Sequence, residues 1–303
     1  MRKAFARAVD LWFAPAPAER LGLLRVVVAA YSLWYLRSRV RMFGRVARTD
    51  PKLFRPVGPV RMLDKPLRPR TADMLTLATI GAEGAFLVGW RHRYAGPACA
   101  SLLLWTLSYR NSWSMIYHSD NLLVLHTVVL GASRSADAYS LDALEYGSLG
   151  SPTSHGRYGW PLRLMNAVTA SAYLLSGVAK VKGPLGWGWA DGKALRSQVA
   201  VDGLRKTVLG GAASPLAARL DSRVGLYRAM AVASLAAELS APFVLLDKRL
   251  TRLWAVGTFG MHWGIYAVMR IKFRYQQSGV LFAPAFEIER LPALLSRVVG
   301  AQA

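Results

Sequence analysis

The apolar residues of this 303-residue chain are gathered into long blocks, and most charged residues lie between the blocks. Hydrophobic residues make up 53% of the chain and charged residues only 18%, whereas soluble domains carry about 25% charged residues. A helix of about 20 apolar residues crosses a bilayer core, so such blocks predict membrane-spanning helices. We therefore expect an all-α fold, a polytopic transmembrane helical bundle, built as one domain over residues 1–303.

Seven apolar blocks are candidate membrane spans, and a shorter eighth follows them. The blocks lie near residues 21–36, 72–90, 94–109, 119–133, 161–181, 226–246 and 253–269, with the eighth near 275–286. The third and fourth are short, so they need neighbouring residues or a partly re-entrant path to cross the bilayer. Residues 1–20 are interrupted by Arg7 and Asp10, which argues against a cleaved signal peptide and favours an amphipathic helix in the membrane interface.

The chain is strongly basic, with a formal net charge of +22 at pH 7. In a soluble protein this charge would indicate nucleic-acid binding, but the hydropathy of the chain argues against a nucleic-acid partner. We expect the basic connections to contact the bilayer and its anionic lipid headgroups instead. The positive-inside rule places residues 37–71 in the cytoplasm, whereas the basic N-terminal segment favours the opposite orientation. The orientation of this multi-pass cell-membrane protein therefore stays open.

Six ionisable side chains fall inside the apolar blocks or at their ends, where a buried charge costs about 2.5–3.5 kcal/mol. They are Arg25, Glu83, His126, Lys180, Glu238 and His262. Opposite charges that pair within the bundle would make this set purely structural. Arg25 lies near the end of its block, where a long side chain can snorkel to the membrane surface. A proton path through Glu83, Glu238 and His262 would suit a transporter, but the chain shows no inverted repeat.

The sequence predicts neither a metal site nor a disulfide. Cys99 is the only cysteine, and no His-x-x-His or Cys-x-x-Cys pattern occurs. His118 and His126 are eight residues apart and lie off a common helical face. We therefore expect no bound metal, and we expect Cys99 to be a small buried hydrophobic residue.

Two segments place polar side chains in apolar surroundings. In the first, Tyr173, Ser176, Gly177 and Lys180 form one helical stripe, and the small residues allow another helix to approach closely. Lys180 then either snorkels at the end of its block or, desolvated at a helix seam, serves as a general base. The second segment, residues 109–121, packs polar and aromatic side chains between two short blocks, as in the wall of a cavity.

In the order of its segments the chain resembles the HTTM membrane domain, a relative of the membrane part of vitamin K-dependent γ-glutamyl carboxylase. The resemblance runs from about residue 13 to residue 286. It rests on FAPAPAERLGLLR (13–25), YRNSWSMIYHSDNLL (109–123), YLLSGVAK (173–180), W-x-D-G-x-A-L (189–195) and FGMHWG (259–264), in this order. The ordered set, above all G-V-x-K with the downstream Trp and Asp-Gly, carries the resemblance.

The resemblance implies a catalytic role for Lys180 and His118. Lys180 corresponds to the base that takes a proton from a reduced quinone, and His118 to a histidine near the quinone ring. Tyr117 stands where the family has an asparagine before that histidine. The implied cofactor is a reduced quinone of the menaquinol or vitamin K hydroquinone type. The further candidates for the cavity or for substrate binding are Arg25, Asn111, Trp113, Asp120, Asn121, Tyr173, Glu238 and His262.

Two functions follow from these observations. The first is a quinol- and oxygen-dependent membrane enzyme, oxidative or a carboxylase-like lyase, with Lys180 as general base and an unknown second substrate. The large lumenal region by which the carboxylase binds its protein substrate has no counterpart in the sequence, so the resemblance does not extend to carboxylation of protein glutamate. The second is a non-catalytic membrane accessory protein for the maturation or export of a small secreted peptide. Some HTTM relatives resemble such accessory proteins, for a peptide of the sporulation-delaying type. Its partner would be that peptide.

Overall fold

The structure, a computed structural model, describes residues 9–145 and 154–291. These residues are all-helical and contain no strand; their one β-bridge joins Ala16 to His155. Contacts divide the chain into two compact units: unit 1 is Met1–Met165 with Phe286–Ala303, and unit 2 is Asn166–Ala285. The expectation of a single domain stays a prediction.

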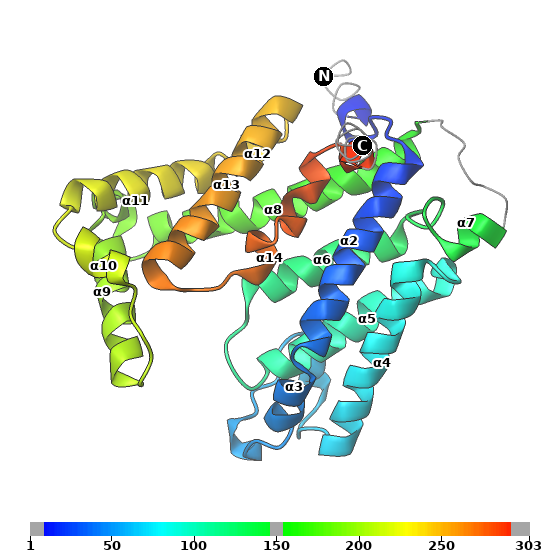
Figure 1. Cartoon of the computed structure of the whole chain (residues 1–303), viewed down its shortest axis with the longest axis horizontal. Coiled ribbons are helices and arrows are strands. Elements are labelled where there is room, and N and C mark those ends of the chain that lie inside the picture. The colour runs from blue at the N-terminus through cyan, green and yellow to red at the C-terminus, as the bar shows by residue number, and fades with distance from the viewer. Residues whose placement is uncertain (1–8, 146–153, 292–303) are drawn as a thin grey trace, which may run out of the picture. The chain divides into compact units, whose positions relative to one another are not determined.

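Unit 1 is built around four long helices. They are α2 (Ala18–Arg37), α4 (Pro69–Val88), α5 (His92–Asn111) and α6 (His118–Ala132). α2 packs on α4 and α6, and α5 packs on the same two helices, so the four form a closed bundle (Figure 1). The shorter elements are α3 (Val40–Val46), η1 (Pro51–Leu53), η2 (Gly58–Met62), α7 (Leu141–Glu145), the start of α8 (Gly156–Lys182) and η5 (Ile288–Arg290).

The bundle of unit 1 is joined by small residues and by hydrogen bonds between helices. α5 and α6 cross at Gly96 and Gly131, where a Cβ on Gly96 would lie 2.5 Å from the carbonyl oxygen of Gly131. The Thr79 and Thr106 hydroxyls lie 2.8 Å apart across the contact between α4 and α5. Close glycine crossings and interhelical hydroxyl bonds are typical of helices that pack in a membrane.

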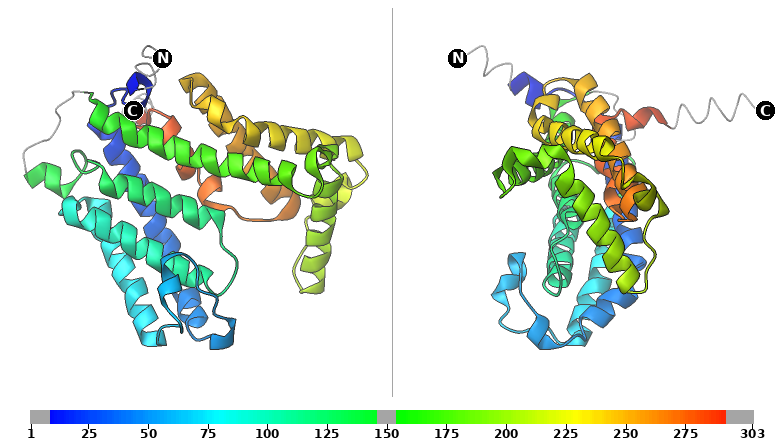
Figure 2. Two further views of the ribbon diagram at one scale, coloured as in Figure 1. Left: turned by 180° about the vertical axis from the view of Figure 1, so that it is seen from behind. Right: turned by 90° about the vertical axis from the view of Figure 1, so that its left-hand side faces the viewer.

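Unit 2 contains the rest of α8 and the helices that follow it. These are η3 (Gly186–Asp191), α9 (Lys193–Val208), α10 (Pro215–Leu220), α11 (Val224–Leu239), α12 (Ala241–Val244), α13 (Lys248–Met269), α14 (Arg274–Gln277) and η4 (Val280–Ala285). α11 packs on η3, α9 and α13, and α9 extends away from the other helices of the unit (Figure 2).

Each of the longer apolar blocks except 226–246 falls on one helix. Block 226–246 is divided between α11 and α12 at Ser240, and the eighth block does not form one continuous helix either. Residues 275–286 are divided between the short helices α14 and η4. The division falls at Gly279, whose positive φ of 78° ends the first helix. Pro284 lies within the second. The eighth candidate segment is therefore not one continuous helix.

Two helices among the described residues, α4 and α8, are long and apolar enough to cross a membrane. α6 and α11 are too short, at 15 and 16 residues. α2, α5 and α13 are long enough, but charged residues interrupt or flank their apolar stretches. The larger number of seven or eight spans stays a prediction.

The N-terminal amphipathic segment is described only in part. Residues 1–8 lie outside the described residues, so the prediction for them is untested. Residues 9–12 are helical, and Val9, Trp12 and Phe13 are exposed. An exposed aromatic face of this kind agrees with a position in the membrane interface.

Candidate functional site

An ion pair between Lys180 and Glu238 lies at the centre of the candidate site in unit 2. Lys180 Nζ, on α8, donates to Glu238 Oε1, on α11. The Glu238 side chain is buried at 7% exposure, whereas that of Lys180 retains 25%. Lys180 therefore lies at a helix seam, which is one of the two interpretations of the stripe. A carboxylate meets it there, so the ammonium is paired and not simply desolvated.

The packing of α8 on α11 depends on the glycine of the stripe. A Cβ on Gly177 would lie 2.9 Å from Glu238 Cβ and 3.0 Å from Leu239 Cδ2. The expected close approach of another helix is thus confirmed at Gly177. Ser176 is exposed instead, because the third position after Tyr173 turns to the edge of the stripe.

Trp189 completes the surroundings of the lysine. Its ring centroid lies 4.8 Å from Lys180 Nζ, which is a cation–π contact. The ring is buried against Ala231 and Leu235. Gly192 follows with φ 83°, and a Cβ there would lie 2.4 Å from the backbone nitrogen of Arg228. In the W-x-D-G pattern, Trp189 therefore contacts the lysine, whereas Gly192 allows a backbone conformation and a close approach to Arg228 that a side chain would prevent.

An apolar cavity of about 440 Å³ lies within unit 2, lined neither by Lys180 nor by Glu238 themselves. Its walls are formed by α9, α11, α13 and η3, and three methionines line it: Met230, Met261 and Met269. Two residues link the cavity to the ion pair. Trp189 lines the cavity and contacts Lys180. Ser234 also lines it, and its hydroxyl lies 3.5 Å from Glu238 Oε1.

Glu238 uses only one of its two carboxylate oxygens. Oε1 accepts from Lys180 and Ser234, whereas Oε2 is buried and has no hydrogen-bond partner among the described residues. A buried carboxylate oxygen without a donor is costly. A hydroxyl group on a ligand would satisfy it.

Tyr173 and His262 form a second polar contact on the same face of α8. The Tyr173 hydroxyl lies 3.4 Å from His262 Nδ1, which donates to the carbonyl oxygen of Thr258 at 2.8 Å. The Tyr173 and Trp254 rings make a T-shaped contact at a centroid distance of 4.9 Å. Seven helical residues separate Tyr173 from Lys180, a rise of about 10 Å. The structure thus brings four sequence candidates into unit 2: Tyr173, Lys180, Glu238 and His262.

The remaining candidates lie in unit 1, and those of residues 109–121 surround Asp120. Tyr35 donates to Asp120 Oδ1 at 2.8 Å, and Arg110 donates to Oδ2 at 2.9 Å. Arg110 also donates to Asn111 Oδ1 at 2.7 Å and stacks on Tyr117 at 4.0 Å. Protein donors therefore occupy both oxygens of Asp120.

The other residues of this segment do not face one polar cavity. Trp113 packs against Phe54, with ring centroids 5.2 Å apart. His118 and Asn121 are exposed at the start of α6. The cavity beside Tyr109 and Arg110 holds about 20 Å³, room for about one water molecule. The catalytic role predicted for His118 stays a prediction.

The ionisable residues of the other apolar blocks have local partners in unit 1. Arg25 donates to the carbonyl oxygens of Ser135, at 2.7 Å, and Tyr139. Glu83 Oε1 accepts from Ser32 at 2.5 Å. His126 Nε2 lies 3.2 Å from the carbonyl oxygen of Met165. Arg25 is fully buried, so the expectation that it snorkels is wrong: the loop after α6 folds over it.

Metal ligands do not cluster in the part of the chain that the structure describes: no group of three or more His, Cys, Asp or Glu is placed to hold a metal ion. Cys99 is fully buried, as expected. Comparison of the chain with protein-family models, with curated proteins and with solved structures finds no match. The candidate function therefore rests on the residues themselves.

Proposed function

We propose that this chain is a multi-pass protein of the cell membrane whose unit 2 binds a reduced quinone and takes a proton from it. One observation carries the proposal: the Lys180–Glu238 ion pair contacts two residues that line an apolar cavity of about 440 Å³. A quinol has an apolar ring and tail that suit such walls. It also has hydroxyl groups that suit the unpartnered Oε2 of Glu238.

The exposure of the helices supports a membrane position. Within the apolar stretches of α4 and α8, 28% of the residues are buried inside the protein. In a soluble protein, core helices this apolar are mostly buried. Much of the surface of α4 and α8 therefore remains for contact with lipid. Exposed apolar residues on α13 point the same way, with Leu253 at 70% and Val256 at 59% exposure.

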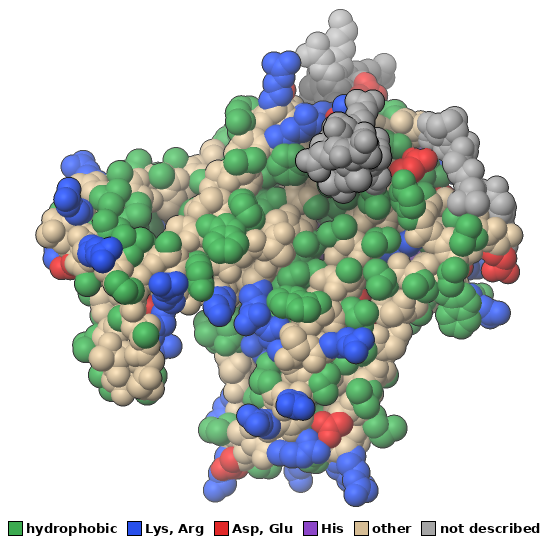
Figure 3. Space-filling model, in the orientation of Figure 1, with side chains coloured by type: hydrophobic (Ala, Val, Ile, Leu, Met, Phe, Trp, Pro, Cys, Tyr) green, Lys and Arg blue, Asp and Glu red, His purple; other side chains and the backbone are tan. Residues whose placement is uncertain are grey.

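The basic connection from Arg37 to Thr71 supports a contact with anionic headgroups. Its Lys and Arg side chains gather at the lower end of unit 1, over α3 and the residues that follow (Figure 3). Each basic residue near an anionic surface contributes about 1 kcal/mol. Protein purified from mixed bilayers should therefore retain anionic phospholipid in preference to neutral phospholipid, and equal retention would contradict this part of the proposal.

Lys180 and Glu238 divide the proton chemistry between them. In the proposal Lys180 passes its proton to Glu238 Oε1, to which it is hydrogen-bonded, and so becomes the amine that acts as the base. The amine then takes a proton from the bound hydroxyl and becomes an ammonium again. Trp189, in contact with Nζ, stabilises that cation beside the oxygen that has lost its proton.

Tyr173 on α8 and His262 on α13 are in polar contact about two helical turns from Lys180 and, in the proposal, relay protons. A bound quinol supplies two electrons and two protons, enough to reduce one molecule of oxygen to hydrogen peroxide. The resemblance to the HTTM domain and its carboxylase relative agrees with this assignment of Lys180.

Oxygen uptake tests the proposed function. The purified protein in lipid is given a panel of reduced quinones, and wild type is compared with Lys180→Ala and with Lys182→Ala, a variant of an exposed lysine two residues further along the same helix. We expect uptake that requires a quinol, is abolished in Lys180→Ala and is unchanged in Lys182→Ala. Uptake by a folded Lys180→Ala variant equal to that of wild type would refute the proposal. No uptake with any quinol would favour the accessory-protein function, which a co-purifying peptide would then support.

A further inference from the structure

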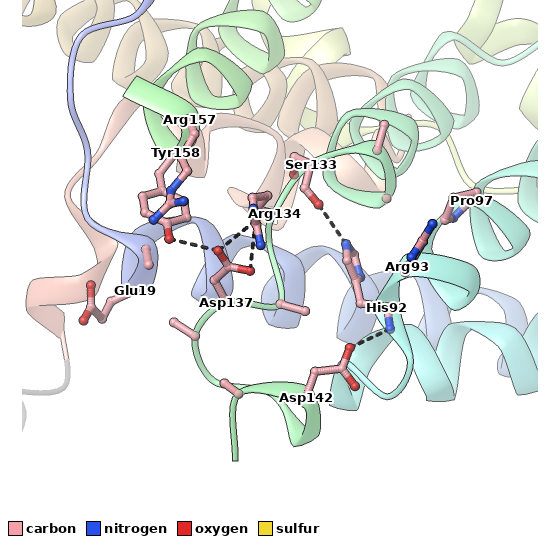
Figure 4. A pocket seen from close by; sticks show the side chains of 16 residues that line it. Glu19, His92, Arg93, Pro97, Ser133, Arg134, Asp137, Asp142, Arg157 and Tyr158 are labelled. Carbon is pink, nitrogen blue, oxygen red and sulfur yellow. Dashed lines mark hydrogen bonds and ion pairs between the residues drawn. The ribbon is translucent and has the colours of Figure 1, made fainter. Parts of the chain in front are cut away.

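A second cavity, of about 700 Å³, lies within unit 1 and takes no part in the proposed function. Its walls come from the starts of α2, α5 and α8, the end of α6, α7, and the loop that joins α6 to α7 (Figure 4). Its volume is in the range of small-molecule binding pockets, about 300–1,000 Å³.

The loop between α6 and α7 forms one wall of this cavity, and hydrogen bonds from its buried side fix its position. The buried Arg25 guanidinium donates to the carbonyl oxygens of Ser135 and Tyr139 in this loop. Ser135 Oγ donates to the carbonyl oxygen of Leu130 at 2.8 Å. Gly22 lets the loop lie against α2, because a Cβ there would come within 2.6 Å of the carbonyl oxygen of Ala138. The cavity wall is therefore preformed.

Protein donors occupy two of the three carboxylates in the cavity. Asp142 accepts from the backbone N–H groups of Arg91, at 2.7 Å, and His92, at 2.8 Å, and so caps α5. Asp137 accepts from the Tyr158 hydroxyl at 2.9 Å and pairs with Arg134 at 3.1 Å. Glu19 is the remaining carboxylate.

Three arginines line the same cavity. In Figure 4 Arg134 lies between Arg157 on one side and Arg93 on the other. Arg93 and Arg157 are exposed, and neither forms an ion pair with a carboxylate of the described residues. The guanidinium of Arg25, buried behind the loop, adds a further positive charge. With Asp137 and Asp142 engaged, the groups left to meet a ligand are mainly cationic.

We infer that this cavity binds a phosphate group, carried either by a lipid headgroup or by a soluble phosphate ester, through Arg93, Arg134 and Arg157. A guanidinium presents a planar fork of donors that matches phosphate oxygens. A terminal phosphate offers three acceptor oxygens and so engages more than one arginine at once, which a carboxylate with two oxygens does less well.

Calorimetric titration of the full-length purified protein tests the inference. Three probes are compared: short-chain phosphatidic acid, glycerol 3-phosphate and succinate, a carboxylate without phosphate. The variant Arg93→Gln/Arg157→Gln removes the two guanidiniums that form no ion pair within the described residues and contact tyrosine side chains, Tyr94 and Tyr158. Its matched control, Arg45→Gln/Arg61→Gln, removes two exposed arginines of unit 1 that do not line the cavity. Thermal unfolding establishes that each variant is folded.

We expect the phosphate probes to bind more tightly than succinate. The cavity variant should bind them about tenfold more weakly or worse, and the control less than about twofold more weakly, because hydrogen bonds to charged groups are the strong ones. Equal binding of both phosphate probes identifies a soluble ester as the source, and binding of the acyl-bearing probe alone identifies a lipid.

The inference is overturned if neither phosphate probe binds, if succinate binds as tightly, or if the control loses as much affinity as the cavity variant. Should the double variant unfold, Arg157→Gln and Arg157→Lys are compared, and equal affinity to wild type in both overturns it.

Discussion

Gly177 of α8 lies directly against Glu238 of α11, so that a Cβ at position 177 would come within 2.9 Å of Glu238 Cβ. The size of the residue at such a crossing sets how closely two helices approach. Lys180 follows one turn later on the same face, and its ammonium reaches the Glu238 carboxylate. The close crossing and the ion pair are therefore parts of one arrangement.

Gly177→Ala should destabilise the protein, although alanine is the better helix former. Glycine in a helix interior costs about 1 kcal/mol relative to alanine, but overpacking a tight contact costs about 1–3 kcal/mol. The nearest neighbour here is the Cβ of Glu238, which moves only with α11, and the Leu239 side chain lies beside it. Thermal unfolding of the purified protein measures the change.

Gly225→Ala is the matched control for that substitution. Gly225 lies in α11 and has no atom within 4 Å of the position its Cβ would take. The same change should therefore stabilise the protein or leave it unchanged. A Gly177→Ala variant as stable as Gly225→Ala would show that α8 and α11 do not meet at this glycine.

Removing one partner of the ion pair should cost more than removing both. Lys180→Met leaves the buried Glu238 carboxylate without its cation, a loss of about 3–5 kcal/mol for fully buried pairs and less here, because a quarter of the Lys180 side chain is exposed. The double variant Lys180→Met/Glu238→Leu replaces the pair by apolar groups and should recover part of that stability. Chemical unfolding of the two variants and of wild type gives the order of their free energies of unfolding. A double variant less stable than Lys180→Met would contradict the account of the pair.

Acid should weaken the start of α13 through Asp247. Its carboxylate accepts from the backbone N–H groups of Leu250 and Arg249, and these bonds lower the pKa of Asp247 below its usual value. A lowered folded-state pKa gives stability that is complete above the unfolded-state value of about 3.9 and is lost as the pH falls through it toward the folded-state value.

Asp247→Asn keeps an acceptor at the cap but removes this titration. The drop in Tm between pH 7 and pH 3 should therefore be smaller in Asp247→Asn than in wild type. Asp64→Asn, which changes an exposed acid that caps no helix, should behave like wild type. An unchanged drop in Asp247→Asn would show that the cap does not contribute to acid sensitivity.

The positions of the helices that carry apolar blocks follow from the sequence, because apolar blocks and charged boundaries are local patterns. α9 lies outside every such block and was not predicted. The number of spans does not follow, since α6 and α11 are too short, at 15 and 16 residues, to cross a bilayer unaided. The burial of Arg25 also could not be predicted from the local pattern of apolar and charged residues. It depends on Ser135 and Tyr139, which lie more than a hundred residues along the chain.

The candidate site was predicted only in pieces. The stripe on α8 placed Lys180 at a seam, but nothing in a single sequence pairs it with Glu238, 58 residues away. Trp189 was marked only by the W-x-D-G pattern, and that pattern does not place its ring beside Lys180. Ser234 carries no such signal: it joins the site because it precedes Glu238 by one helical turn.

The most direct test of the central claim is whether the cavity beside Lys180 and Glu238 holds the quinol. Gly264 lines that cavity on α13, and Gly260 lies one turn away on the same helix without lining it. A Cβ at either position would have no neighbour within 4 Å, so leucine should be tolerated at both. Equilibrium binding of a quinol is then measured for wild type, Gly264→Leu and Gly260→Leu. We predict binding that Gly264→Leu weakens by about tenfold or more and that Gly260→Leu leaves unchanged, since leucine at position 264 fills the space that the ligand needs. Equal affinity in Gly264→Leu and wild type would contradict the account.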